Sequence, residues 1–222
     1  MFRGEVTRRG FLEAGAVAAV ADKLTDGGFT AVSEPGVPKR GRPVVPAGAK
    51  SLREFRRRCV GCQLCVKACP EKVLRPSMDA ARFLQPEMGF EHGYCRLECS
   101  RCGEVCPAGA ISPMSRDEKL HTHIGRAMWH KDRCLAAKDG ITCTACERHC
   151  PAKAIVLVKG VPVVDADRCI GCGACENLCP ARPLPGISVE GCEVHRSERP
   201  VPGGKVAYER AHPGRFRRLE QV

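Results

Sequence analysis

The sequence is poor in aromatic side chains and contains no long apolar run. Of its 222 residues, one is Trp, two are Tyr and seven are Phe, whereas 23 are Gly and 17 are Pro. This composition favours short elements joined by many turns, and it makes a large apolar core difficult to close. The length allows one or two domains. We therefore expect something other than apolar packing to hold the chain together, and its 17 cysteines are the obvious candidates.

The motifs of several functional classes are also missing. The sequence shows no nucleophile–base set, no dinucleotide-binding loop and no open metal site, so we do not expect an enzyme in its own right. It also lacks a motif that combines aromatic and basic residues, which argues against nucleic acid as a partner despite a net charge of +11.

What is present is a fourfold repeat of cysteines. Sixteen of the 17 cysteines fall in four blocks that each end in Cys-Pro, at residues 59–70 (CVGCQLCVKACP), 95–107 (CRLECSRCGEVCP), 134–151 (CLAAKDGITCTACERHCP) and 169–180 (CIGCGACENLCP). Blocks one and four read C-x2-C-x2-C-x3-C-P. Blocks two and three lengthen only the first gap, to three and eight residues. The seventeenth, Cys192, belongs to no block, and we expect a small strand residue there, not a ligand.

This spacing is typical of proteins that bind 4Fe–4S clusters. A cubane of four irons needs four thiolates, and C-x2-C-x2-C brings three sulfurs to one cube. Small or turn-prone residues such as Gly61, Gly171 and Gly173 let the backbone approach it. The fourth cysteine leaves on a helical turn toward a second cluster, and the proline then ends the helix. Four clusters of about −2 each would reduce the net charge of +11 to about +3.

Two other cysteine chemistries fit less well. Zinc sites favour paired C-x2-C knuckles without a third cysteine and a terminal proline. An exported disulfide scaffold would have an even number of cysteines and no such regular blocks.

Which blocks share clusters is a question of topology. Consecutive pairing is the simplest, with blocks one and two in one module and blocks three and four in the other. The four ligand sets are then Cys59, Cys62, Cys65 and Cys106; Cys95, Cys99, Cys102 and Cys69; Cys134, Cys143, Cys146 and Cys179; and Cys169, Cys172, Cys175 and Cys150. An interleaved arrangement, which pairs block one with four and two with three, uses the same sixteen cysteines and stays open.

The N-terminus has the pattern of an export signal. Residues 7–12 read TRRGFL, and a mildly apolar stretch follows from Phe11 to Ala21 that is too short to span a bilayer. The pattern resembles a twin-arginine signal, with small residues that suit cleavage after Ala21, although an uncleaved anchor is an alternative. Such a signal implies export of a protein that is already folded around its cofactor. Bare thiols threaded into an oxidising compartment would form disulfides.

Five regions follow from these features, in an α+β fold of tandem ferredoxin-like modules with short helices and β-hairpins. They are a signal region (1–32), a Pro/Gly-rich linker (33–49), two modules with two clusters each (50–120 and 121–196) and a basic tail (197–222). Residues 50–58 predict a helix, and residues 154–158 and 161–164 predict a hairpin around Lys159-Gly160. Further short strands are expected at 72–77, 110–115, 126–132 and 186–195.

The twin-arginine start, the Pro-rich linker and the four Cys-Pro blocks together resemble the MauM/NapG-type ferredoxins. These are exported polyferredoxins associated with periplasmic nitrate reduction and methylamine utilisation. The resemblance implies a periplasmic electron carrier with four 4Fe–4S clusters, whose redox partners are a membrane quinol oxidase or a molybdoenzyme. Membrane association is expected only through a partner or an uncleaved signal. Two alternatives remain: a permanent subunit of a molybdopterin oxidoreductase, and a maturation or redox-sensing factor.

Overall fold

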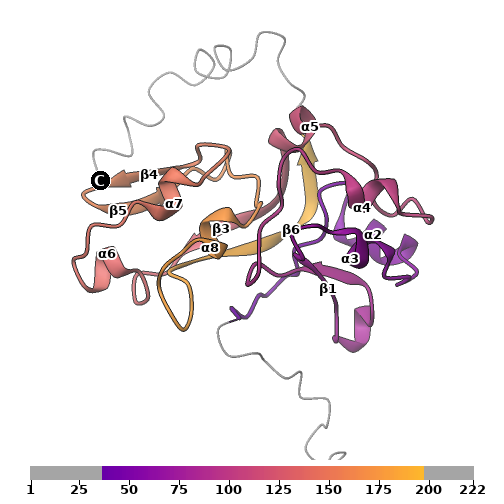
Figure 1. The fold of residues 1–222 in the computed structure, drawn as a ribbon, viewed down its shortest axis with the longest axis horizontal. Coiled ribbons are helices and arrows are strands. Elements are labelled where there is room, and N and C mark those ends of the chain that lie inside the picture. Colours follow the sequence, from indigo (N-terminus) through magenta and orange to yellow (C-terminus); the bar gives the residue numbers. More distant parts are fainter. Residues whose placement is uncertain (1–36, 198–222) are drawn as a thin grey trace, which may run out of the picture. The chain divides into compact units, whose positions relative to one another are not determined.

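The computed structural model describes residues 37–197, in which short helices and two-stranded sheets alternate (Figure 1). The helices are α2 (Leu52–Arg58), α3 (Leu64–Ala68), the 3-10 helix η1 (Ala80–Arg82), α4 (Arg101–Glu104), α5 (Arg116–Leu120), α6 (Leu135–Lys138), α7 (Ala145–Arg148) and α8 (Ala174–Asn177). The strands are β1 (Leu74–Pro76), β2 (Pro86–Met88), β3 (Thr122–Trp129), β4 (Ile155–Val158), β5 (Val161–Val164) and β6 (Ile187–Ser197). The expected α+β class is thus observed. No helix in this part of the chain is long and apolar enough to cross a membrane.

The predicted signal region and nearly all of the basic tail lie outside the described residues. Their boundaries, and the division into two modules, stay predictions.

In residues 37–197, three antiparallel strand pairs make up the sheets: β1 with β2, β3 with β6, and β4 with β5. The β4–β5 hairpin is the one predicted, and its turn residues Lys159 and Gly160 have φ of 51° and 83°. Positive φ at both turn residues is the requirement of a type I′ turn, which suits the twist of a hairpin. The predicted helix at 50–58 is also observed as α2, because Ser51 caps its first turn by accepting a hydrogen bond from the Glu54 amide at 3.1 Å.

Other strands are only partly as expected. The predicted strands at 72–77 and 186–195 correspond to β1 and β6, whereas β3 begins at Thr122, four residues before the expected start at 126. The strand expected at 110–115 is wrong, and that segment is a bend followed by irregular chain. Ile111 is buried there, and the Ser112 amide donates to the Gly48 carbonyl at 3.0 Å. Pro113 has no amide hydrogen to continue a ladder.

Residues 37–49, which were expected to form part of a linker, pack against both halves of the chain. The first half is residues 50–120 and the second half is residues 121–196. Val44 and Val45 are 0% and 3% exposed. The Val44 carbonyl accepts from the Met88 amide on β2 at 2.8 Å, and the Arg42 carbonyl accepts from the Gly191 amide on β6 at 3.2 Å. These residues form no helix or strand, and backbone hydrogen bonds hold them in place.

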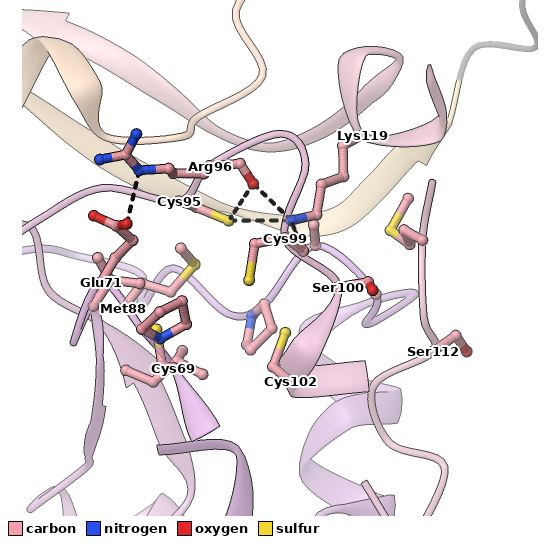
Figure 2. A pocket seen from close by; sticks show the side chains of 17 residues that line it. Cys69, Glu71, Met88, Cys95, Arg96, Cys99, Ser100, Cys102, Ser112 and Lys119 are labelled. Atoms are coloured by element: carbon pink, nitrogen blue, oxygen red, sulfur yellow. Dashed lines mark hydrogen bonds and ion pairs between the residues drawn. The ribbon is translucent and has the colours of Figure 1, made fainter. Parts of the chain in front are cut away.

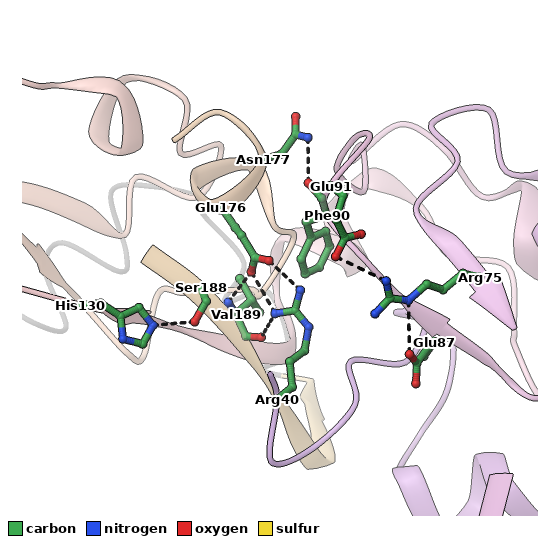
Figure 3. Close-up of polar contacts among 10 residues, drawn as sticks. All are labelled: Arg40, Arg75, Glu87, Phe90, Glu91, His130, Glu176, Asn177, Ser188 and Val189. Carbon is green, nitrogen blue, oxygen red and sulfur yellow. Dashed lines mark hydrogen bonds and ion pairs between the residues drawn. The ribbon is translucent and has the colours of Figure 1, made fainter. Parts of the chain in front are cut away.

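Helix α8 lies against the loop that follows β2, and this contact joins the two halves (Figure 3). The ring of Phe90 is 1% exposed, and a Cβ atom on Gly173, where φ is +84°, would overlap it. Asn177 of α8 donates to the Phe90 carbonyl at 2.8 Å. The guanidinium of Arg40 lies 5.3 Å from the centre of the same ring.

A buried ion pair reinforces this contact. Arg40 donates to both carboxylate oxygens of Glu176, at 2.6 and 3.0 Å, and to the Val189 carbonyl at 2.7 Å (Figure 3). The two charged side chains are 8% and 3% exposed. Because both are buried, loss of either charge leaves the other without compensation in a medium of low dielectric constant.

We expect Glu176→Gln to reduce the free energy of unfolding of the iron-loaded protein by about 3–5 kcal/mol, because Arg40 would keep a buried charge without a counter-ion. Anaerobic urea titration followed by visible absorbance measures this. The control is Glu54→Gln, whose partner Arg58 is 52% exposed and where the loss should stay below about 1 kcal/mol. Equal losses in the two variants would show that the Arg40–Glu176 charges do not stabilise the contact.

Candidate iron–sulfur centres

Four hollows in the described part of the chain are each lined by four cysteines. We name each hollow after the block that supplies three of them. The first is lined by Cys59, Cys62, Cys65 and Cys106; the second by Cys69, Cys95, Cys99 and Cys102; the third by Cys134, Cys143, Cys146 and Cys179; and the fourth by Cys150, Cys169, Cys172 and Cys175. These are the four sets expected for consecutive pairing, and the interleaved sets are not found together. That the sixteen thiolates bind iron stays a prediction.

The fourth cysteine of every block crosses to the neighbouring hollow. In the first half, α3 packs on α4. Cys69, directly after α3, faces the second hollow, and Cys106, shortly after α4, faces the first. In the second half α7 packs on α8, and Cys150 and Cys179 are exchanged in the same way. A short helical turn reverses the direction of the side chain within a few residues, which is why C-x3-C suffices for the crossover.

Left-handed residues shape the loops that carry the first three cysteines of blocks one and four. Gly61 and Gly171 have φ of 66° and 76°, as suits the small residues that the sequence places between the first two cysteines. Gln63 is also left-handed, with φ of 64°, and its side chain donates to the Gly61 carbonyl at 3.0 Å. Sequence reasoning missed this role of Gln63, because glutamine is not a residue type that indicates a left-handed conformation.

Backbone amides point at several of the sulfurs. Those of Ala127, Ala154 and Gly186 donate to the Sγ atoms of Cys169, Cys150 and Cys179 at 3.4, 3.3 and 3.2 Å. Donors of this kind favour the charged form of a thiol and raise the reduction potential of a cluster that the thiolate binds.

Burial has the opposite effect on the free thiols. It raises the pKa of Cys65 and Cys146 to about 11 and that of Cys102 and Cys172 to about 12, and neighbouring thiols of the same hollow add to the increase. The pKa of Cys175 is also raised well above its usual value by burial. Each hollow thus contains at least one thiol with a raised pKa, and bound cationic iron would offset this cost of ionisation.

The geometry favours a cluster over the two rival chemistries. All 17 cysteines are free, so no disulfide framework is present. Among residues 37–197, no group of three or more His, Cys, Asp or Glu side chains converges closely enough to hold a single metal ion. The four sulfurs of each hollow line a space between them, as a four-iron cube requires. The donor set and the backbone amides fit a 4Fe–4S cluster.

The two irregular blocks are accommodated differently. In block three, helix α6 fills the widened gap and begins directly after Cys134, so that this cysteine returns to the third hollow. In block two, the buried side chain of Lys119 contacts the widened loop. Sequence reasoning missed Lys119 and its helix α5, although Ser115 and Glu118 form a capping box whose S-x-x-E pattern is readable. Cys192 lies on β6 and lines none of the four hollows.

Comparison with known proteins agrees with this geometry. The family model of the 4Fe–4S dicluster domain matches twice, at residues 58–110 and 140–182. The two matched segments together contain fifteen of the sixteen block cysteines, and only Cys134 precedes the second match. Fold and site therefore define an iron–sulfur protein of the ferredoxin type that transfers electrons.

Relatives specify the family. The chain is 33% identical over 180 residues to the methylamine utilization ferredoxin-type protein MauM of Methylorubrum extorquens, which covers 74% of this chain and 80% of the relative. MauM of Paracoccus denitrificans is 31% identical over 186 residues, or 76% of this chain and 81% of the relative. The chain belongs to this MauM family of ferredoxin-type proteins, as its motifs led us to expect.

Coverage of other relatives is lower. The match to MauM of Methylophilus methylotrophus, at 35% identity, spans 61% of that protein's length. Among solved structures, a chain of the formate dehydrogenase–heterodisulfide reductase–formylmethanofuran dehydrogenase complex from Methanospirillum hungatei matches 71% of this chain and 55% of its own length, with 20% identity and a TM-score of 0.27. A likeness this weak carries no functional argument.

Removal of two cysteines tests the ligand sets. Cys69→Ala and Cys99→Ala should each lose about four of about sixteen irons per chain, and the double variant should lose no more than either alone, because both cysteines line the second hollow. Iron and acid-labile sulfide assays after anaerobic purification measure the loss. Cys192→Ala serves as the control and should keep all the iron. A loss of about eight irons in the double variant would instead indicate interleaved pairing.

Proposed function

We propose that this chain is a periplasmic electron relay, in which four 4Fe–4S clusters pass single electrons between a membrane quinol-oxidising donor and a periplasmic reductase. The observation that carries the proposal is the continuity of the four hollows. Neighbouring hollows are joined by exchanged cysteines or by a backbone hydrogen bond, so that an electron has a path through all four hollows.

The links define an order. The first and second hollows exchange Cys69 and Cys106, and the fourth and third exchange Cys150 and Cys179. Between the halves, the Cys95 amide of the second hollow donates to the Cys172 carbonyl of the fourth at 3.0 Å. The path therefore runs first, second, fourth, third, and not in the order of the blocks along the sequence.

Exposed apolar side chains lie beside both ends of this path. In the first hollow Cys62 is the one exposed cysteine of the chain, and its neighbours Val60 and Leu64 are 73% and 48% exposed. At the other end Ile141, two residues before Cys143, is 51% exposed. In the fourth hollow, Cys150, Cys169 and Cys175 are buried. Exposed apolar side chains beside an end cluster suit transient contact with a redox partner.

The chain's own residues have three tasks in such a relay. The cysteines hold each cluster, the backbone amides at Ala127, Ala154 and Gly186 lower the cost of added negative charge, and the buried walls exclude water. When bound, the clusters supply one-electron redox chemistry. No bond is made and no proton is required, which accords with the lack of a nucleophile–base set in the sequence.

The order of the path predicts a pattern of spin coupling in the fully reduced protein. Cys169→Ala removes a ligand of the fourth hollow and should abolish coupling between the two halves while coupling of the first and second clusters remains. Cys143→Ala affects an end of the path and should leave coupling across the Cys95–Cys172 junction intact. Paramagnetic resonance of dithionite-reduced samples measures both, and coupling between the halves that survives Cys169→Ala would disprove the order.

The proposed location is supported by the residues TRRGFL at 7–12, which lie outside the described structure. A cluster protein needs its iron inserted before it meets an oxidising compartment, and transport in the folded state satisfies that need. The relatives are named for methylamine utilization, and we propose that the redox partner of this chain is a periplasmic oxidoreductase.

Export can be tested with the paired change Arg8→Lys and Arg9→Lys, which keeps the positive charge of the signal. Iron-loaded protein should then accumulate in the cytoplasmic fraction, because a twin-arginine route requires both arginines. Arg3→Lys, outside the motif, should leave periplasmic accumulation unchanged. If the paired variant still reaches the periplasm, the proposed route is wrong.

Purification in the native state separates the relay from a permanent subunit. A relay should leave affinity purification as a single chain with its iron. A stable, stoichiometric molybdopterin subunit in the same fraction would assign the chain to an oxidoreductase complex instead.

A further inference from the structure

Lys119 is a buried lysine whose ammonium group contacts the loop between the first two cysteines of block two. Its residue is 6% exposed and lies on α5 beside the second hollow. The ammonium donates to the Arg96 carbonyl at 2.9 Å and to the Cys99 carbonyl, and it lies 3.6 Å from the Sγ atom of Cys95 (Figure 2). All three acceptors belong to the segment that joins the first two cysteines of block two.

No carboxylate balances this charge among the ion pairs of residues 37–197. The acidic residues in the neighbourhood are held elsewhere. Glu118 accepts from the amide and hydroxyl of Ser115, Glu98 pairs with Arg116, and Glu71 pairs with Arg96. Two carbonyls and a thiol satisfy the hydrogen-bonding capacity of Lys119, but a buried ammonium also needs an opposite charge nearby.

The same loop is the one that departs from the regular spacing. Blocks one and four place two residues between their first cysteines and turn there on Gly61 and Gly171, both with positive φ. Block two has Arg96-Leu97-Glu98 in this position, with three residues and no glycine. Lys119 binds two carbonyls of this longer loop, so the lysine does for block two what the glycine turn does for blocks one and four.

We propose that Lys119 is the counter-charge of the cluster in the second hollow and sets its reduction potential above that of the same cluster without the lysine. A cluster with four thiolates is anionic, and it becomes more so by one charge when it gains an electron. A fixed cation 3.6 Å from one ligand sulfur stabilises the reduced form more than the oxidised form. The electron comes from an external one-electron donor, and no bond or proton changes place.

This inference rests on the proposed cluster in the second hollow, but it does not depend on the partners or the location of the protein. Iron content of the unchanged protein tests the cluster itself. The variants below test Lys119, so a failure of one can be told from a failure of the other.

The decisive comparison is Lys119→Gln against Lys119→Arg, with Lys67→Gln as the matched control. Glutamine keeps a hydrogen-bond donor and removes the charge, whereas arginine keeps the charge. Lys67 lies two residues before Cys69, another ligand of the same hollow, but it is exposed to solvent, which screens its charge. Potentials are measured by anaerobic redox titration followed by paramagnetic resonance, together with iron content.

If the Lys119→Gln variant keeps its full iron content, the equilibrium constant for reduction of one cluster should fall on the order of tenfold. This corresponds to a reduction potential lower by about 59 mV for one electron. Lys119→Arg and Lys67→Gln should change it far less. Loss of about four irons in Lys119→Gln but not in Lys119→Arg would also support the proposal, because the charge would then be needed to keep the cluster. Unchanged iron and potentials in Lys119→Gln would overturn it, as would equal iron loss in the glutamine and arginine variants.

Discussion

The exchange of one cysteine between neighbouring blocks is the constraint on which the rest of the structure depends. Because Cys69 and Cys106 each face the hollow of the other block, neither block can complete its four thiols alone. The same holds for Cys150 and Cys179. Segments far apart in the sequence are thereby joined in pairs, although the helices that carry the cysteines are only four or five residues long. Helices of that length have little stability of their own, so the bound cofactor and the packing around it must supply it.

The join between the two halves depends on different physics. It combines a buried aromatic ring, a glycine beneath it and the Arg40–Glu176 ion pair, and residues 37–49 add backbone hydrogen bonds to both sides. Since the Cys95–Cys172 hydrogen bond lies in this join, its rigidity also bears on the spacing of the second and fourth hollows. Electron transfer between clusters needs that spacing to be constant, and a buried, charged contact holds it better than a loose linker would.

The charges of the thiols and of the basic residues near the hollows also bear on the binding of the clusters. Burial raises the pKa of Cys65 and Cys146 to about 11 and that of Cys102 and Cys172 to about 12, so these thiols resist ionisation. Cationic iron reverses that balance when a cluster binds. One cation of the basic excess in the sequence, Lys119, is buried against the widened ligand loop of block two. Most other basic side chains near the cysteines, such as Lys67, are exposed and act through solvent.

Sequence alone determined the class of cofactor, the sixteen candidate ligands and the MauM family, because the local spacing C-x2-C-x3-C-P, preceded by a further cysteine, occurs four times. It also determined α2 and the β4–β5 hairpin, whose cap and turn residues act within a few positions. Only the tertiary structure decided that the halves meet at Cys95 and Cys172, that 110–115 is no strand and that Lys119 lies behind block two. The Cys95–Cys172 junction and the position of Lys119 depend on contacts between residues distant in the chain, for which spacing and propensity carry no signal, whereas Pro113 was a readable sign against the strand.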